Sequence, residues 1–237
     1  RLENDEQGML DYAAASGWGP VHTENLLNSD RRYNYYTWKD EVDNYSQFNN
    51  QLLFTRELNR FFALNVSLHY TKGNGYFEQY QYAENAFDDN QFEFYGLDNP
   101  VIGNDTITTS DFIRRRWLDN DFYGFVASLN YKKSHWNVWL GGGWNKYDGQ
   151  HFGEVIWSTI ATTYTLPYRY YDNSAIKNDG NVYARANYQI NNKLNLYIDL
   201  QYRRVNYSFD GVDASGSLSQ QDVKLNFFNP KAGFNYQ

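Results

Sequence analysis

The 237-residue chain contains no cysteine, a single methionine and only four prolines. The absence of cysteine excludes a disulfide scaffold and cysteine-ligated metal sites, and it leaves oxidising and reducing compartments equally open. No window approaches about 18 consecutive apolar residues, which excludes a transmembrane helix. The formal net charge of −7 argues against duplex nucleic acid as a partner, because such binding needs basic patches. The dispersed prolines mark no linker, so no domain boundary is predicted.

Aromatic residues are abundant in this chain, although its mean hydropathy is only −0.79. They make up 19% of the sequence, whereas all hydrophobic residues together reach 41%. So many rings supply enough apolar area to order a chain, which disfavours disorder. The shortage of Leu, Ile and Val disfavours a helical bundle and a doubly wound α/β fold. A transmembrane β-barrel remains compatible, because its lipid-facing residues alternate with polar ones and the average is polar.

The dominant pattern is an alternation of apolar and polar residues with period two, which is typical of half-buried strands. The clearest run spans 194–202, where Leu194, Ile198 and Tyr202 alternate with polar residues. A weaker pattern indicates an eighth strand near Tyr33–Lys39. The seven predicted strands centre on 48–54, 62–70, 123–131, 136–144, 182–190, 194–202 and 228–236.

The connections between these runs alternate in length. Short turns are expected at 57–60, 132–134 and 191–193, and long loops near 81–113, 148–178 and 210–223. In an antiparallel up-and-down meander, all the short turns then lie at one end and all the long loops at the other. Long loops are usually functional. The predicted fold class is therefore all-β, with the function concentrated at the loop end.

Ring placement within the apolar runs favours a membrane over a soluble sandwich. Tyr123 and Tyr131 flank Ala127, and Trp136 and Trp144 flank Leu140. Amphipathic rings at both ends of an apolar band are what the two interfaces of a bilayer select. A soluble β-sandwich, whose inner faces also alternate, stays as the alternative.

Four segments carry a family resemblance: Gly96–Gly103, Ile113–Gly124, Gly141–Gly153 and Phe227–Gly233. They resemble the barrel portion of TonB-dependent outer-membrane receptors, and the resemblance covers nearly the whole chain. It implies that residues 1–237 form seven or eight strands of a barrel of about 22, without the plug domain and the TonB-contacting segment. Residues 1–30, which are acidic and irregular, are then the remainder of a preceding loop.

The resemblance also implies a location and partners. A receptor of this family lies in the cell outer membrane and takes up a scarce ligand, such as a ferric siderophore, haem or cobalamin. Its implied partners are outer-membrane lipid, its own plug domain, TonB through that plug, and a small-molecule or metal-chelate ligand. No cofactor and no catalytic activity are expected.

The long loops carry the candidate ligand-binding residues, because exposed rings can stack on planar ligands. The Arg114-Arg115-Arg116 run could neutralise an anionic chelate or bind lipopolysaccharide phosphates, or it is simply a solvated strand end. The rings could equally pack the loops together or belong to the aromatic girdle. The candidate rings are Tyr80, Tyr82, Phe92, Phe94, Tyr95, Trp157, Tyr164, Tyr168, Tyr170 and Tyr171.

A second group is expected to face the lumen and the plug: Arg185, Asp199, Gln201 and Arg203. On the family interpretation these side chains offer charge-assisted hydrogen bonds to the plug. The alternative is a static ladder across neighbouring strands, which contributes about 0.2–1 kcal/mol per pair.

Catalytic and metal sites have little support. The four histidines are scattered, and no nucleophile elbow, phosphate loop or zinc-protease motif is present. Asp88–Asn90 and Asp119–Asp121 carry oxygen ligands for calcium but lack the twelve-residue loop of an EF-hand, so no metal is predicted. The rival interpretation is a secreted carbohydrate-binding module or glycosidase domain, in which Glu154 and Asp172 are the carboxylates to test. A third interpretation is a porin or adhesin barrel.

Overall fold

The computed structural model describes residues 6–15, 20–29, 38–39, 41–83, 89–212 and 218–236. Its principal element is one antiparallel sheet of seven strands in the order β1-β2-β5-β6-β7-β8-β9, which is a meander without crossovers. The predicted all-β class is thereby confirmed. The strands are β1 (Asp43–Glu57), β2 (Phe62–Gln81), β5 (Phe112–Lys133), β6 (Trp136–Ser158), β7 (Tyr168–Gln189), β8 (Leu194–Val212) and β9 (Leu218–Tyr236).

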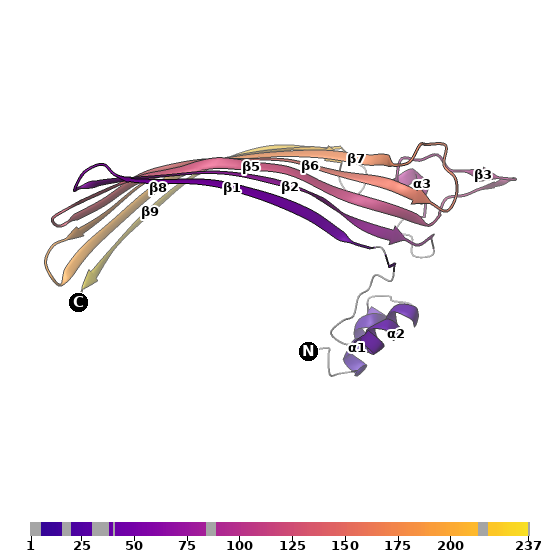
Figure 1. Cartoon of the computed structure of the whole chain (residues 1–237). Helices are drawn as coiled ribbons and strands as arrows, with labels where there is room; N and C mark the ends of the chain where they lie inside the picture. The colour runs from indigo at the N-terminus through magenta and orange to yellow at the C-terminus, as the bar shows by residue number, and fades with distance from the viewer. Residues whose placement is uncertain are drawn as a thin grey trace.

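The sheet forms a long curved band with two different ends (Figure 1). The tight turns β1–β2, β5–β6 and β7–β8 gather at one end, which we call the turn end. The β2–β5 connection, with α3 (Gln91–Phe94) and the β3–β4 hairpin (Val101–Ile102 and Asp105–Thr106), lies at the opposite loop end. The strands hold 15 to 23 residues, far more than the usual 5 or 6. They are therefore long enough to cross a bilayer and continue beyond it.

The register divides the strand residues between two faces. Val66 pairs with Ala127, Ala127 with Gly142, and Gly142 with Val182, so these residues share the face that we call the apolar face. Their immediate neighbours along each strand lie on the polar face. The apolar band runs from Phe62 to Tyr70 in β2 and from Tyr123 to Tyr131 in β5, which matches the about 9–11 residues of a transmembrane strand.

Two of the predicted long loops are wrong. β6 continues to Ser158 and β7 begins at Tyr168, so the loop expected over 148–178 shrinks to 159–167. β8 reaches Val212 and β9 begins at Leu218, so most of 210–223 is strand. The apolar alternation stops at the end of the apolar band, but backbone pairing continues past it. Only the β2–β5 connection, 82–111, is as long as expected.

The N-terminal segment also differs from the prediction. Residues expected to be irregular form α1 (Glu6–Ala15) and α2 (Pro20–Ser29), which contact each other. The first helix is rich in alanine and other strong helix formers, and the second begins with proline, which suits a first helical position. The predicted eighth strand lies mostly outside the described residues, and Trp38 and Lys39 are not in a strand. No helix in the described ranges is both long and apolar enough to span a membrane.

The β2–β5 connection folds back onto the loop end of the polar face. Gly96 follows the C-cap of helix α3 and has a φ of +65°. The backbone N–H groups of Gly96 and Leu97 donate to the carbonyls of Glu93 and Phe92, respectively, both at 2.8 Å. This is a Schellman motif, which places Leu97 back against Phe92. The buried loop core that results consists of Phe92, Tyr95, Leu97, Phe112 and Val155.

Candidate ligand-binding site

The loop end of the polar face contains a pocket of about 650 Å³. Two adjacent rows of the register build it. The first row runs from Phe77 through Arg116 and Gly153 to Tyr171, across four strands. The second row contains Gly75, Leu118, His151 and Asn173, and Tyr45 of β1 completes it. A concave site of this size, walled by rings and a few polar groups, suits a small-molecule ligand.

Arg116 is the central cation of this pocket. Its guanidinium carbon lies 5.9 Å from the Phe77 ring centroid and 6.0 Å from that of Tyr171, within the range of cation–π attraction. Gly153 lies between Arg116 and Tyr171 in the row and adds no side chain. Arg116 is exposed, and no carboxylate among the described residues forms an ion pair with it. Its positive charge is therefore available to a ligand.

Glycines create the space that the rings occupy. A Cβ atom on Gly73 or Gly75 would overlap Tyr45, and one on Gly153 would overlap the rings of Tyr170 and Tyr171. Asn173 is held by the neighbouring strand β8, because its side-chain amide donates to the Val212 carbonyl (3.0 Å) and accepts from the Val212 N–H (2.8 Å). The walls of the pocket are thus fixed by the sheet itself.

Five of the predicted loop rings pack in or against the loop core, namely Phe92, Phe94, Tyr95, Tyr168 and Tyr170. Tyr95 is fully buried, and its ring contacts those of Phe94 and Tyr170 edge to face at 5.2 and 4.9 Å. Tyr168 packs against the same core and donates to the Gly96 carbonyl at 3.2 Å. Burial raises the pKa of Tyr170 to about 12, so its hydroxyl stays protonated. These rings order the loop that borders the site.

Of the remaining predicted rings, Tyr171 lines the pocket and the other four lie apart from it. Tyr80 and Trp157 share a row with Ile113 on the apolar-face side, and their ring centroids are 6.2 Å apart. Tyr82 packs on Tyr80 at 4.5 Å, and Tyr164 packs on Tyr168 at 4.8 Å. Tyr80, Tyr82 and Trp157 thus pack against one another, which was one of the alternatives for this group.

The arginine triplet is divided by the strand. Arg114 and Arg116 lie on the polar face, whereas Arg115 lies on the opposite side. The Arg115 guanidinium contacts the Glu78 carboxylate at 2.8 Å and lies 4.4 Å from the Tyr76 ring centroid. Arg115 is therefore separated from the pocket, and its predicted role in binding a ligand there has no geometric support.

The predicted lumen residues all lie on the polar face, closer to the turn end. Arg185 and Asp199 are register partners whose charged groups are 2.9 Å apart, and the Tyr197 hydroxyl also donates to Asp199 at 2.8 Å. Arg203 is bound to Asp179, and Gln201 accepts from Asn229 at 3.3 Å. These contacts are the cross-strand ladder that was the alternative to plug binding, and contact with a plug stays a prediction.

The carboxylates proposed for other chemistry are occupied by cations. Arg169 lies 3.8 Å from Glu154 and 2.7 Å from Asp172. Lys72 contacts Asp121 at 3.0 Å and also contacts Asp119, while the intervening Asn120 lies on the other face. Asp88 is outside the described residues. Among the residues that are described, no three metal-ligating side chains come together.

Sequence reasoning missed Tyr45, Phe77 and His151 of the pocket. All three lie on strand extensions beyond the apolar band, where the alternation fades. Their position parity along β1, β2 and β6 carried the missing signal, because it assigns them to the same face as Arg116.

Comparison with solved structures supports the fold. The chain is similar to the ferric-catecholate import receptor Fiu from E. coli K12 in its open form, with 12% identity and a TM-score of 0.51 over 90% of this chain and 35% of that one. The closed form gives 11% identity and a TM-score of 0.52 over 92% and 34%. The chain thus spans about a third of the length of these receptors.

No family model matches the chain. No curated protein matches it either. At 11–12% identity, the structural likeness supports the antiparallel β-sheet fold and leaves the ligand open.

Proposed function

We propose that this chain forms part of the wall of an outer-membrane receptor of the TonB-dependent type, which takes up a scarce ligand. On this proposal, the apolar band contacts lipid, the polar face lines the lumen, and the loop end faces the outside. The likeness to an import receptor supports this arrangement, and the length of the apolar runs supports the membrane setting.

The observation that carries the proposal is the pocket around Arg116. It lies at the loop end of the lumen-lining face, where a ligand arriving from outside meets the protein first. A guanidinium between two rings suits an anionic ligand with planar groups, because it combines charge-assisted hydrogen bonds with stacking. A ferric siderophore with aromatic groups and haem both meet this description, and cobalamin meets it less well.

The chain covers 35% of the receptor to which it is similar, so energised transport is proposed for the whole receptor. On the proposed function, a plug occupies the lumen beside Arg185, Asp199, Gln201 and Arg203, and TonB acts through that plug. The chain itself contributes lumen lining and the ligand-facing loop, without catalysis and without a bound cofactor.

The adjacent arginines provide a matched test of the pocket. Arg116→Gln removes the pocket cation, and Arg115→Gln removes a cation one residue away on the opposite side of the strand. We expect Arg116→Gln to weaken binding of an anionic ferric catecholate by about tenfold or more, because charged hydrogen bonds contribute about 1.5–3 kcal/mol. Arg115→Gln should change the affinity less than about twofold.

The measurement is calorimetric titration of the full-length receptor in detergent with ferric catecholate, haem and cobalamin in turn. Equal affinities for the two variants with every ligand would contradict the assignment of the pocket. Binding of cobalamin, but of neither ferric catecholate nor haem, would contradict the role of Arg116.

A further inference from the structure

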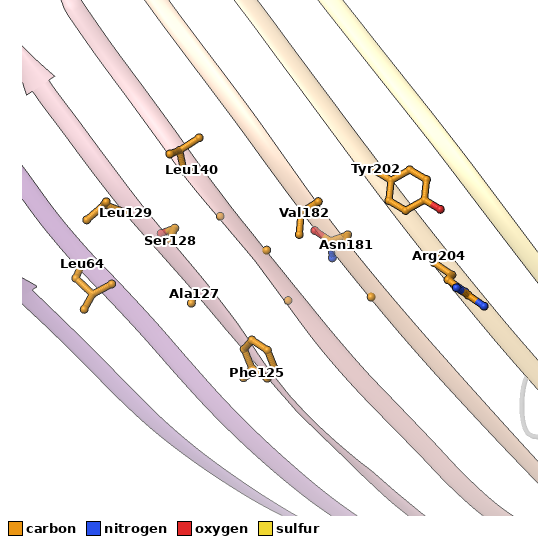
Figure 2. A pocket seen from close by; sticks show the side chains of 14 residues that line it. Leu64, Phe125, Ala127, Ser128, Leu129, Leu140, Asn181, Val182, Tyr202 and Arg204 are labelled. Atoms are coloured by element: carbon orange, nitrogen blue, oxygen red, sulfur yellow. The ribbon is translucent and has the colours of Figure 1, made fainter.

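The apolar face is hollowed at its centre, across β5 to β8 (Figure 2). The depression measures about 660 Å³ and is open toward the side that the proposed function places in the membrane. Leu140 of β6 and Val182 of β7 lie in the middle of the depression, with Leu64 and Phe125 on one side and Tyr202 on the other. Its lining is almost wholly apolar.

Small residues produce this hollow. Ala127 pairs with Gly142 in one row of the register, and Trp144 pairs with Gly180 in the next row. A Cβ atom on Gly180 would meet only the Trp144 ring at 3.6 Å and the Gly143 carbonyl at 3.9 Å, which are ordinary contacts. A larger side chain would therefore be tolerated at Gly180, and it would occupy the depression.

A single cation stands at the loop-end limit of the depression. Arg204 follows Tyr202 on the same face of β8, and it pairs with Gly180 on one side and Asn226 on the other. Its Nε donates to the Asn206 side-chain oxygen at 3.3 Å, and no ion pair to it exists among the described residues. The guanidinium is exposed at the boundary between apolar and polar rows.

The surroundings of Arg204 are polar and include a second cation, the exposed Lys224 of β9, which is the register partner of Asn206 and forms no ion pair among the described residues. Lys72 and Lys146, the lysines beyond the apolar band on β2 and β6, are each paired with aspartates at 3.0 and 2.8 Å. Asn178 and Asn206 are register partners in the row immediately beyond Arg204. An apolar trough thus leads to the Arg204 guanidinium and then to a row in which Asn178 and Asn206 are followed by Lys224.

We propose that this depression binds a phosphorylated glycolipid, with one acyl chain in the trough and a phosphate on Arg204. An acyl chain matches the apolar lining, and a guanidinium binds phosphate through two parallel hydrogen bonds. Amides beside it suit the hydroxyl groups of a sugar headgroup. The inference rests on the proposed function only in placing the apolar face in the membrane, and it concerns the face opposite the ligand pocket.

The test uses the full-length protein in mild detergent, with monophosphoryl lipid A added and retention measured by native mass spectrometry. Arg204→Gln removes the cation, and Gly180→Leu fills the trough. Each should lower the retained fraction by about tenfold. The controls are Arg203→Gln, which removes the adjacent cation on the polar face, and Gly233→Leu, which adds the same side chain to the polar face in open space. Both controls should retain the glycolipid.

Three results would overturn the inference. The first is that Arg204→Gln and Gly180→Leu retain as much monophosphoryl lipid A as the wild-type protein. The second is that the wild-type protein retains lipid A stripped of its phosphate equally well. The third is that it retains phosphatidylglycerol equally well, which would remove the role of the sugar. Heat-dependent electrophoretic mobility reports whether each variant is folded, and Arg204→Gln, at an exposed position, keeps the test decisive if Gly180→Leu misfolds. A wild-type protein that stays monodisperse without detergent would instead overturn the proposed function.

Discussion

At the scale of single residues, burial decides the state of one carboxyl group at the loop end. Oε1 of Glu41 accepts the Tyr80 N–H at 3.0 Å, whereas Oε2 is buried without a hydrogen-bond partner among the described residues. Burial raises the pKa of Glu41 above its usual value, and the Tyr80 hydrogen bond opposes this shift only in part. A carboxyl group whose pKa is raised by folding stabilises the fold most below its unfolded pKa. That contribution is lost as the pH rises through the folded pKa.

Glu41→Gln keeps an acceptor for Tyr80 and removes the charge. We expect the protection of the Tyr80 amide against hydrogen exchange to fall from pH 4 to pH 7 in the wild type, after correction for intrinsic exchange rates. In Glu41→Gln it should stay constant over this range. Mass-spectrometric exchange on a peptide containing Tyr80 measures both. The same pH dependence in the two proteins would mean that another group titrates.

At the scale of elements, the Schellman motif after α3 holds the loop core in place. Gly96 has a φ of +65°, which is disfavoured for residues with a Cβ atom, and its own Cβ would lie 3.3 Å from the Tyr168 hydroxyl. Gly96→Ala should therefore destabilise the loop core by about 1–2 kcal/mol. Hydrogen exchange over 89–112 should become faster, while exchange in β8 stays unchanged. Gly233→Ala, which meets nothing within 4 Å, is the control. Unchanged exchange in Gly96→Ala would show that the motif does not limit loop opening.

The seven strands could be predicted because each of them carries an apolar row with a period of two residues. The strand ends could not, because beyond the band both faces are polar. There, the row Glu78–Arg115–Glu154–Arg169 keeps the register by alternating charge. Such pairs become visible only when the strands are aligned. The loop core and the pocket were missed for the same reason, since each joins residues far apart in the chain. The separation of Arg115 from Arg116, in contrast, follows directly from the two-residue period.

At the scale of the whole molecule, the sheet has three levels from the turn end to the loop end. An apolar band comes first, then a belt of paired charges around Lys72 and Lys146, then rings such as Trp117 and Phe152. The opposite face is polar beside the apolar band, and at the third level it carries rings and the ligand pocket. The edge strands β1 and β9 are largely exposed, and long open edges favour pairing with further strands. This layering is what a wall between lipid and a water-filled lumen requires.

The difference between the two faces can be tested with neighbouring residues of one strand. Leu200, 42% exposed, lies in the apolar band of β8, and Gln201 lies at the same depth on the polar face. In a bilayer, Leu200→Arg should lower the free energy of unfolding by about 2–4 kcal/mol, because it places a charge in lipid. Gln201→Arg should lower it by less than about 1 kcal/mol, because its side chain faces water. Guanidinium unfolding of the full-length protein in lipid vesicles measures both values. Equal losses in the two variants would mean that the apolar face does not contact lipid, and the assignment of the sheet to a membrane wall would fail with it.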